Sequence, residues 1–251
     1  MSDKMAIRVP DEYMVVGCGG VASYFFPSFF RTVNHMFAKS SLPKVTIVDG
    51  DILEEKNMAR QLFSSFEPVK KVEAIEKMYA GLYGRKIAKR QTYFSGDEMV
   101  EENTVLFCFA DNHLCRKHVL EAVDLGTECM AICAANSTIS AQAYLYHPSW
   151  KGTVLDPRVR FPEIETDESD SPLKIGDCNS EAVLNSIPQT ALANTMAASC
   201  ALLLWNLWCN DIPKLGEIDR DDFDRLPVEF FNTGSSMGRI TIKELTSLNP
   251  E

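Results

Sequence analysis

A glycine-rich turn near the N-terminus is the first place where the residue types suggest chemistry. Residues 13–16 form an apolar run that ends in Gly17-Cys18-Gly19-Gly20, and an aromatic-rich segment with helical spacing follows it. Glycines let backbone N–H groups approach a phosphate closely, and the N-terminus of a following helix favours negative charge. The turn therefore predicts a nucleotide site; the alternative is a tight strand-to-helix turn without a ligand.

Polar side chains after the next apolar run, residues 45–48, add groups that suit a ribose and a phosphate chain. Asp49 and Asp51 follow this run, and either carboxylate could hydrogen-bond ribose hydroxyls, as in NAD-binding folds. The same loop then carries Asn57, Arg60 and Gln61. An NAD domain has no use for these amides and this guanidinium, whereas a reaction at a phosphate needs such groups. An NAD-dependent oxidoreductase is therefore the last-ranked hypothesis.

The order of these motifs resembles that of the ThiF/MoeB and ubiquitin-activating enzyme family. Residues 49–61 resemble the D-x-D...N-x-x-R-Q signature of the family, and residues 71–74 resemble its K-A-E-A helix start. Asp111-Asn112 followed by Arg116 matches its D-N-x-x-x-R element, and the strand and hairpin at 131–146 are also similar. The resemblance covers residues 13–147 in order, which is far more specific than one glycine motif.

This resemblance implies an enzyme that uses ATP and Mg²⁺ to adenylate the C-terminal carboxylate of a ubiquitin-like or sulfur-carrier protein. Attack on the α-phosphate builds up negative charge, so cations and amide donors are needed around it. By the family pattern, Asn57, Arg60 and Gln61 contact the phosphates and Lys71 holds the leaving pyrophosphate. The pattern places magnesium at Asp111, which suits an ion that prefers one or two carboxylates plus phosphate oxygens.

Alternatives stay open for these cations. Lys70 competes with Lys71, although residues 72–74 after Lys71 fit the family register. Arg60 and the lysine could instead be solvated and paired with nearby glutamates, and the chain could be a catalytically inactive partner subunit that keeps the fold. The complete and ordered set of motifs favours the catalytic hypothesis.

Cys178 is the candidate for a second step, the formation of a thioester. It is the only cysteine in a polar, loop-like sequence, and it lies in the acidic segment 157–180, which we expect to be a flexible crossover within the domain. Related activating enzymes carry their acceptor cysteine in such a crossover. Asp177 and Glu181 would raise its pKa, so an incidental cysteine, with transfer to an external sulfur donor, is an equal alternative.

Other family features are missing from the sequence. There is no C-x-x-C pair, so we expect no structural zinc, and the other seven cysteines fit buried, reduced thiols. The helices that supply an arginine to the ATP site of the partner subunit are absent, and Arg8 lies too close to the first strand to replace it. The chain resembles a minimal stand-alone bacterial member, and residues 231–240 are similar to the PRTRC type.

Hydrophobic patterning predicts the elements that must position these residues. It indicates strands at 13–16, 45–48, 87–93, 104–109 and 128–134, and helices at 23–39, 68–83 and 111–123 with Asp111 as N-cap. An antiparallel strand at 141–146, an apolar helix at 190–209 and a closing hairpin at 228–242 follow. We expect one ThiF-like adenylation domain over residues 1–251. Its fold should be α/β and Rossmann-like, a mostly parallel sheet with helices on both faces and a mixed antiparallel extension.

Composition limits the partners. The 251 residues are 45% hydrophobic and carry a net charge of -10, which excludes fibres and disorder and disfavours sequence-independent nucleic-acid binding. The N-terminal residues lack the features of a secretory signal, so we expect a cytoplasmic protein. Asn194 and other polar residues argue against a membrane span at 190–209, which we expect to be a buried helix or the face of a homodimer.

Overall fold

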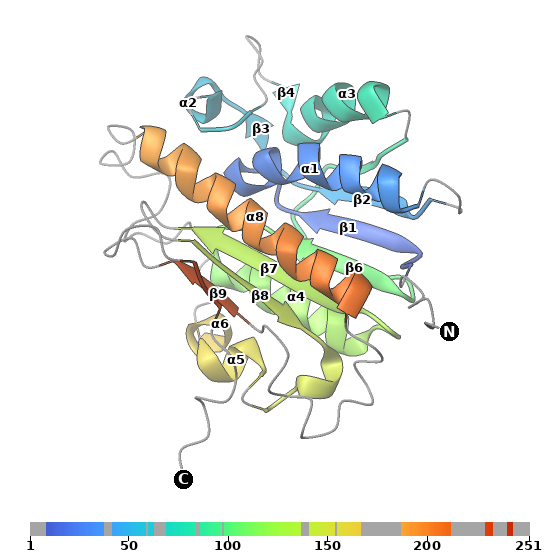
Figure 1. Ribbon diagram of the computed structural model, residues 1–251, viewed down its shortest axis with the longest axis vertical. Helices are drawn as coiled ribbons and strands as arrows, with labels where there is room; N and C mark the ends of the chain where they lie inside the picture. The colour runs from blue at the N-terminus through green and yellow to red at the C-terminus, as the bar shows by residue number, and fades with distance from the viewer. Residues whose placement is uncertain are drawn as a thin grey trace, which may run out of the picture.

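The structure of the protein is a computed structural model. It describes residues 9–37, 42–58, 60–62, 69–83, 86–96, 98–136, 141–153, 155–166, 187–211, 229–232 and 240–242. Within these ranges the chain forms an eight-stranded sheet with the strand order β10-β9-β8-β7-β6-β1-β2-β5 (Figure 1). The sheet divides into a parallel part, which holds the predicted motifs, and an antiparallel part.

The parallel part consists of strands from apolar runs, and such strands need cover on both faces. β1 pairs with β2 on one side and with β6 on the other, so that Val16 lies in register with both Val48 and Cys108. The parallel strands are β1 (Glu12–Val16), β2 (Lys44–Val48), β5 (Ala88–Arg90), β6 (Thr104–Cys108) and β7 (Met130–Asn136). The expected Rossmann-like, mostly parallel sheet is confirmed.

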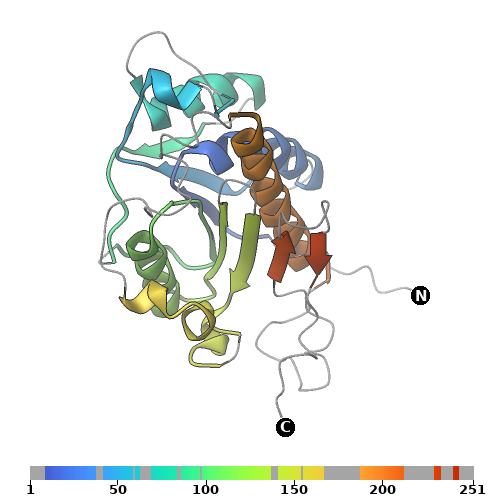
Figure 2. The ribbon, with the colours of Figure 1, turned by 90° about the vertical axis from the view of Figure 1, so that its left-hand side faces the viewer.

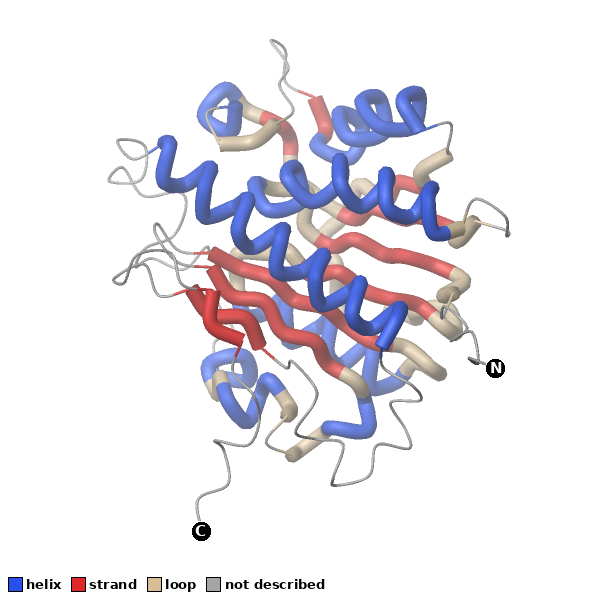
Figure 3. Tube along the Cα trace, viewed as in Figure 1, coloured by secondary structure: helices blue, strands red, loops and turns tan. Residues whose placement is uncertain are grey.

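Helices cover both faces of this sheet (Figures 2 and 3). On one face α8 packs against α1, β7 and β8, and α3 packs beside α1; on the other face α4 packs against β6 and β7. These helices are α1 (Gly20–Met36), α3 (Lys71–Tyr83), α4 (His113–Leu125) and α8 (Ile187–Asp211). The two-sided cover explains why the central strands β1, β2, β6 and β7 are mostly apolar and buried.

Aromatic side chains fill the layer between the sheet and the helices α1 and α8. The rings of Phe25 and Phe107 lie 4.7 Å apart, and Tyr13 meets Trp205 of α8 edge to face at 5.7 Å. The indole N–H of Trp205 also donates to the hydroxyl oxygen of Tyr13 at 3.3 Å, which satisfies a buried polar group. The apolar helix predicted at 190–209 is therefore part of the core, and none of the described helices has the length and apolar character needed to cross a membrane.

The antiparallel part continues the sheet beyond β7. β8 (Ala141–Tyr146) pairs antiparallel with β7, and β9 (Glu229–Asn232) and β10 (Ile240–Ile242) follow as an antiparallel pair. A small separate sheet of β3 (Ile52–Leu53) and β4 (Val69–Lys70), with the short helix α2 (Glu55–Met58), holds the polar loop after β2. The predicted pairing of the C-terminal strands is confirmed.

The structure corrects several predicted boundaries. The helix expected from residue 68 begins at Lys71, because residues 69–70 pair with β3, and the strand expected at 87–93 is only Ala88–Arg90. The N-cap of α4 is Asn112, whose side-chain oxygen accepts the N–H of Cys115 at 2.8 Å. Asp111, which we expected to cap the helix, lies one residue before the N-cap and lines a cavity instead.

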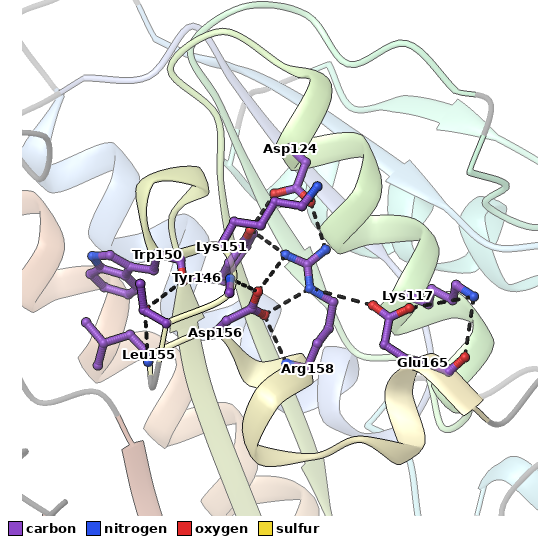
Figure 4. A network of polar contacts seen from close by, with 11 residues as sticks. Lys117, Asp124, Tyr146, Trp150, Lys151, Leu155, Asp156, Arg158 and Glu165 are labelled. Carbon is purple, nitrogen blue, oxygen red and sulfur yellow. Dashed lines mark hydrogen bonds and ion pairs between the residues drawn. The ribbon is translucent and has the colours of Figure 1, made fainter. Parts of the chain in front are cut away.

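The segment expected to be a flexible crossover is ordered in its first part. Residues 157–166 form two short helices, α5 (Pro157–Arg160) and α6 (Glu163–Thr166), after the 3-10 helix η1 (Pro148–Trp150). The buried guanidinium of Arg158 binds Asp124 of α4 at 2.7 Å and Asp156 at 2.9 Å, as Figure 4 shows. Composition alone predicted mobility here, whereas these ion pairs hold the chain on α4. The later part of the segment, with Cys178, lies outside the described residues.

Candidate functional site

The site lies where the sheet reverses its strand order. From β1 the chain builds outward through β2 to β5 and then returns to build β6 and β7 on the other side. Loops at the carboxyl ends of β1 and β6 therefore leave in opposite directions, and ligands of such sheets bind in the crevice between them. A cavity of about 760 Å³ occupies this place. Its lining includes the predicted Gly17, Gly19, Gly20, Asp49, Asp51, Asn57, Arg60, Gln61, Lys71 and Asp111.

The glycine turn leads into the N-terminus of α1 at the cavity. Gly17 has a φ of +87°, and a Cβ there would lie 2.8 Å from the backbone nitrogen of Ala110, so only glycine fits. A Cβ on Gly19 would meet no described atom within 4 Å. α1 begins at Gly20, and no described side chain caps its first turn. Uncapped N–H groups at a helix N-terminus favour an anion.

Asp49 holds this turn to the end of β2. One of its carboxylate oxygens accepts the N–H of Cys18 at 2.6 Å, and the other accepts the N–H of Asp51 at 2.7 Å. Burial raises the pKa of Asp49 above its usual range, although the charge of Lys71 and the two N–H donors oppose this rise. Of the two aspartates proposed for a ribose, Asp49 is thus engaged with the backbone, and Asp51 is the more open carboxylate.

Lys71 and Tyr93 converge on the carboxylate of Asp51. The Lys71 ammonium lies 2.7 Å from one oxygen, and the Tyr93 hydroxyl donates to the other at 2.8 Å. Burial lowers the pKa of Lys71, but the charge of Asp49 and the bond to Asp51 outweigh this effect, so its pKa is raised and the ammonium stays charged. Lys70 is half exposed and lies 3.8 Å from Glu73, so the geometry favours Lys71 as the cavity cation.

The remaining polar residues of this loop are buried against the cavity wall. Asn57 is 6% exposed, and its side-chain oxygen accepts the N–H of Glu54 at 2.9 Å, which closes the turn that leads to Arg60. The backbone N–H of Arg60 donates to the Asn57 carbonyl at 3.1 Å. Gln61 is 8% exposed. The loop thus brings an arginine and two amides to the same cavity as Lys71.

Asp111 lines the cavity from the opposite side, after β6. Arg116, which completes the same motif, is buried on α4 and donates to the carbonyl of Ala110 at 3.2 Å, so it supports the turn that carries Asp111. Within the described ranges no cluster of three or more His, Cys, Asp or Glu side chains forms a ready metal site. A single carboxylate such as Asp111 fits Mg²⁺ when phosphate oxygens complete the coordination, which is how this ion commonly binds.

Tyr93 and Asn194 are among the cavity residues that were not predicted from the sequence. Tyr93 follows β5, and its 72% exposed ring lies over Gly50, so that a Cβ there would be 2.8 Å from the ring. Asn194 of α8 is 2% exposed and lines the cavity beside Gly20. Its only signal in the sequence is a polar residue in an apolar helix. Six of the seven described cysteines are buried free thiols, and Cys115 lines the cavity.

In sequence comparisons, neither a protein-family model nor a curated protein matches the chain. Solved structures do match. E. coli MccB with AMPCPP and MccA aligns with a TM-score of 0.55 and 17% identity, covering 93% of this chain and 63% of MccB. E. coli MccB with ATP gives a TM-score of 0.55, 17% identity and coverage of 96% and 64%. PaaA aligns with a TM-score of 0.57 and 16% identity over 96% of this chain and 64% of PaaA.

The chain thus spans less than two thirds of the length of the solved proteins that it resembles. At this low identity the likeness concerns the backbone, which has the same mostly parallel sheet flanked by helices. These alignments show that the protein has the Rossmann-like α/β fold found in MccB and PaaA.

Proposed function

We propose that the protein is an ATP-dependent adenylyltransferase of the ThiF/MoeB type, which activates the C-terminal carboxylate of a ubiquitin-like or sulfur-carrier protein. One observation carries the proposal: the glycine turn, the loop with Arg60, the start of α3 with Lys71 and the turn with Asp111 all line one cavity. These segments are far apart in the sequence and match the family motifs in order. The MccB structures with ATP and with MccA support a nucleotide at this fold.

The proposed chemistry is an in-line displacement at the α-phosphorus of ATP. A carboxylate oxygen of the substrate tail forms the new bond to phosphorus while the bond to the β-phosphate oxygen breaks, and pyrophosphate leaves with that electron pair. Arg60 would stabilise the charge that develops on the α-phosphate oxygens, and Lys71 would neutralise the leaving pyrophosphate. Asp111 would hold Mg²⁺, which would help to neutralise the phosphate charge, and Asp51 would accept hydrogen bonds from the ribose hydroxyls.

The proposed second step is transfer of the acyl group from the adenylate to a sulfur atom. The acyl-adenylate would transfer its acyl group to the thiolate of Cys178 with release of AMP, or to an external sulfur donor instead. Mass spectrometry after incubation with ATP and a candidate carrier distinguishes Cys178 from an external sulfur donor. A reductant-sensitive adduct that Cys178→Ala abolishes supports the internal thioester.

A homodimer also belongs to the proposal. On the outer face of α8 the side chains of Leu192 and Leu203 are 63% and 40% exposed, and such apolar side chains could pack against a second copy of the chain.

The test of the first step is ATP–pyrophosphate exchange in the presence of candidate carrier proteins. Arg60→Ala and Asp111→Ala should each slow the exchange by about 10²- to 10³-fold, because each removes a group that stabilises charge in the transition state. Lys70→Ala is the matched control, since Lys70 is exposed and pairs only weakly with Glu73, and its exchange rate should stay unchanged. Exchange that survives both the Arg60 and the Asp111 substitution would remove this site from the reaction.

A further inference from the structure

Asn194 is a polar side chain buried in an apolar part of α8. It is 2% exposed, and Ala193 and Ala197 on the same helix are equally buried. A buried carboxamide weakens a protein unless hydrogen bonds compensate for the lost water. The side chain also lines the cavity of the candidate site. Its position therefore suggests a role at the site rather than in the core.

The carboxamide of Asn194 fits between two segments that the candidate site depends on. On one side its Nδ2 donates to the backbone carbonyl of Arg60 at 3.3 Å. On the other side it lies against Gly20, the first residue of α1. A Cβ on Gly20 would lie 2.7 Å from both Cγ and Oδ1 of Asn194, closer than side chains tolerate. Asn194 thus separates the glycine turn from the Arg60 peptide and fixes their spacing.

Ser23 makes a second connection between the same segments. Its hydroxyl donates to the carbonyl of Gly20 at 2.7 Å and accepts the N–H of Leu62 at 3.2 Å. Residues 60–62 are therefore tied to α1 through Ser23 and to α8 through Asn194. Two ties at neighbouring peptides restrict both the distance and the orientation of this short segment.

We propose that Asn194 is a positioning residue that sets the place of Arg60 relative to the glycine turn, so that α8 forms part of the nucleotide site. The catalytic consequence rests on the proposed function. The placement of Asn194 between Gly20 and the Arg60 peptide, which we call the wedge, rests on the contacts alone. A guanidinium that stabilises a transition state must lie close to its ideal position, and a displacement of about 1 Å can cost about 10²-fold in rate. Loss of Asn194 should therefore act through Arg60.

The wedge is tested by thermal unfolding of four proteins: the wild type, Gly20→Ala, Asn194→Ala and the double variant. The backbone of Gly20 has no positive φ, so alanine is unfavourable there only because it overlaps Asn194. Gly20→Ala should lower the Tm of the wild type by about 5 °C and should have little effect in the Asn194→Ala background. Equal Tm losses in both backgrounds would overturn the wedge.

The positioning role is tested by exchange kinetics and direct ATP titration. Asn194→Ala should lower kcat by about 10²-fold while the ATP Kd changes by less than about threefold. The double variant Asn194→Ala/Arg60→Ala should be no slower than Arg60→Ala alone, because both act on one group. Asn206→Ala, an exposed asparagine on the same helix, is the control and should match the wild type.

Multiplicative losses in the double variant, or a loss confined to KM, would overturn the positioning role. If Asn194→Ala does not fold, Asn194→Ser replaces it, since the shorter hydroxyl leaves the space beside Gly20 open and should give the same pattern. A wild type without ATP-dependent exchange would refute the proposed function, and the Gly20 and Asn194 Tm measurements would then still decide whether the wedge exists.

Discussion

Asp49 and Asp51 are separated by one glycine, yet the structure gives them different surroundings. Asp49 accepts two backbone N–H groups and shapes the glycine turn, whereas Asp51 receives the Lys71 ammonium and the Tyr93 hydroxyl. Residue type alone left both open as ribose ligands. The difference arises largely from segments far away in the sequence. The N–H of Cys18 after β1 reaches Asp49, whereas Lys71 of α3 and Tyr93 after β5 reach Asp51.

Lys71 and Lys70 are neighbouring lysines, one buried at the cavity and one half exposed, so their alanine variants can be compared directly. Lys71→Ala should slow ATP–pyrophosphate exchange by about 10²-fold, because it removes a buried cation from the cavity and leaves Asp51 without its ion pair. Lys70→Ala should leave the rate unchanged, since the ammonium of Lys70 is solvated. Initial rates of ATP–pyrophosphate exchange for both variants check this prediction. A slower exchange for Lys70→Ala than for Lys71→Ala would contradict this prediction and would make Lys70 the lysine that contacts the pyrophosphate.

The candidate site could be predicted where motifs are local and could not where contacts are long-range. The glycine turn, the loop after β2 and the turn after β6 each have a recognisable spacing, and the site residues predicted in them line the cavity. Asn194 lies 134 residues from its partner Arg60, and a lone asparagine in a helix has no spacing signal. Tyr93 was missed for the same reason, because its hydroxyl reaches Asp51 only after β2 and β5 pair.

At the scale of elements, α5 shows how a few ion pairs override composition. The acidic segment around it predicted mobility, but Arg158 is nearly buried between Asp124, Asp156 and the ring of Tyr146. Lys151 also pairs with Asp124 at 2.8 Å (Figure 4). A buried charge must be compensated by opposite charge and hydrogen bonds, and here the partners come from three elements. This cluster fixes α5 to α4 and β8.

The Asp124 cluster should make stability depend on acid pH. Burial raises the pKa of Asp124, but hydrogen bonds from Arg158, Lys151 and Tyr146 outweigh this, so its pKa lies below the usual range. A depressed carboxyl pKa contributes stability above the unfolded value of about 3.9, and this is lost as pH falls through the folded pKa. Urea unfolding between about pH 6 and pH 3 should therefore show a steeper loss for the wild type than for Asp124→Asn.

Asp124→Asn should also lower the free energy of unfolding at pH 7. Asp124→Asn leaves Arg158 with one carboxylate fewer in a nearly buried place, so we expect a loss of about 3–5 kcal/mol at pH 7. Glu163→Gln, on the exposed side of α6, is the control and should change the free energy of unfolding by less than about 0.5 kcal/mol. Parallel pH profiles for the wild type and Asp124→Asn would exclude the cluster as the source of the acid sensitivity.

For the whole molecule, the sheet determines both the place of the site and the means of holding an anion. The net charge of -10 repels phosphates at long range, so binding must rely on local cations and backbone N–H groups. The reversal of strand order between β1 and β6 brings these groups to one crevice. Apolar runs and helical spacing predicted the parallel sheet and the closing hairpin, because strands and helices differ in the period at which apolar residues recur. They could not predict that α8 reaches the cavity, since that depends on packing.

The proposed function requires a nucleotide in this cavity with its phosphates on the glycine turn. The most direct test is calorimetric titration of Mg²⁺·ATP into the wild type and Gly19→Leu. Gly19 lines the cavity, and a Cβ there would meet no described atom within 4 Å, so a leucine should block the phosphates without disturbing the fold. We predict that the wild type binds ATP and that Gly19→Leu binds at least about tenfold more weakly with an unchanged Tm. Equal ATP affinity for the two proteins would contradict the account.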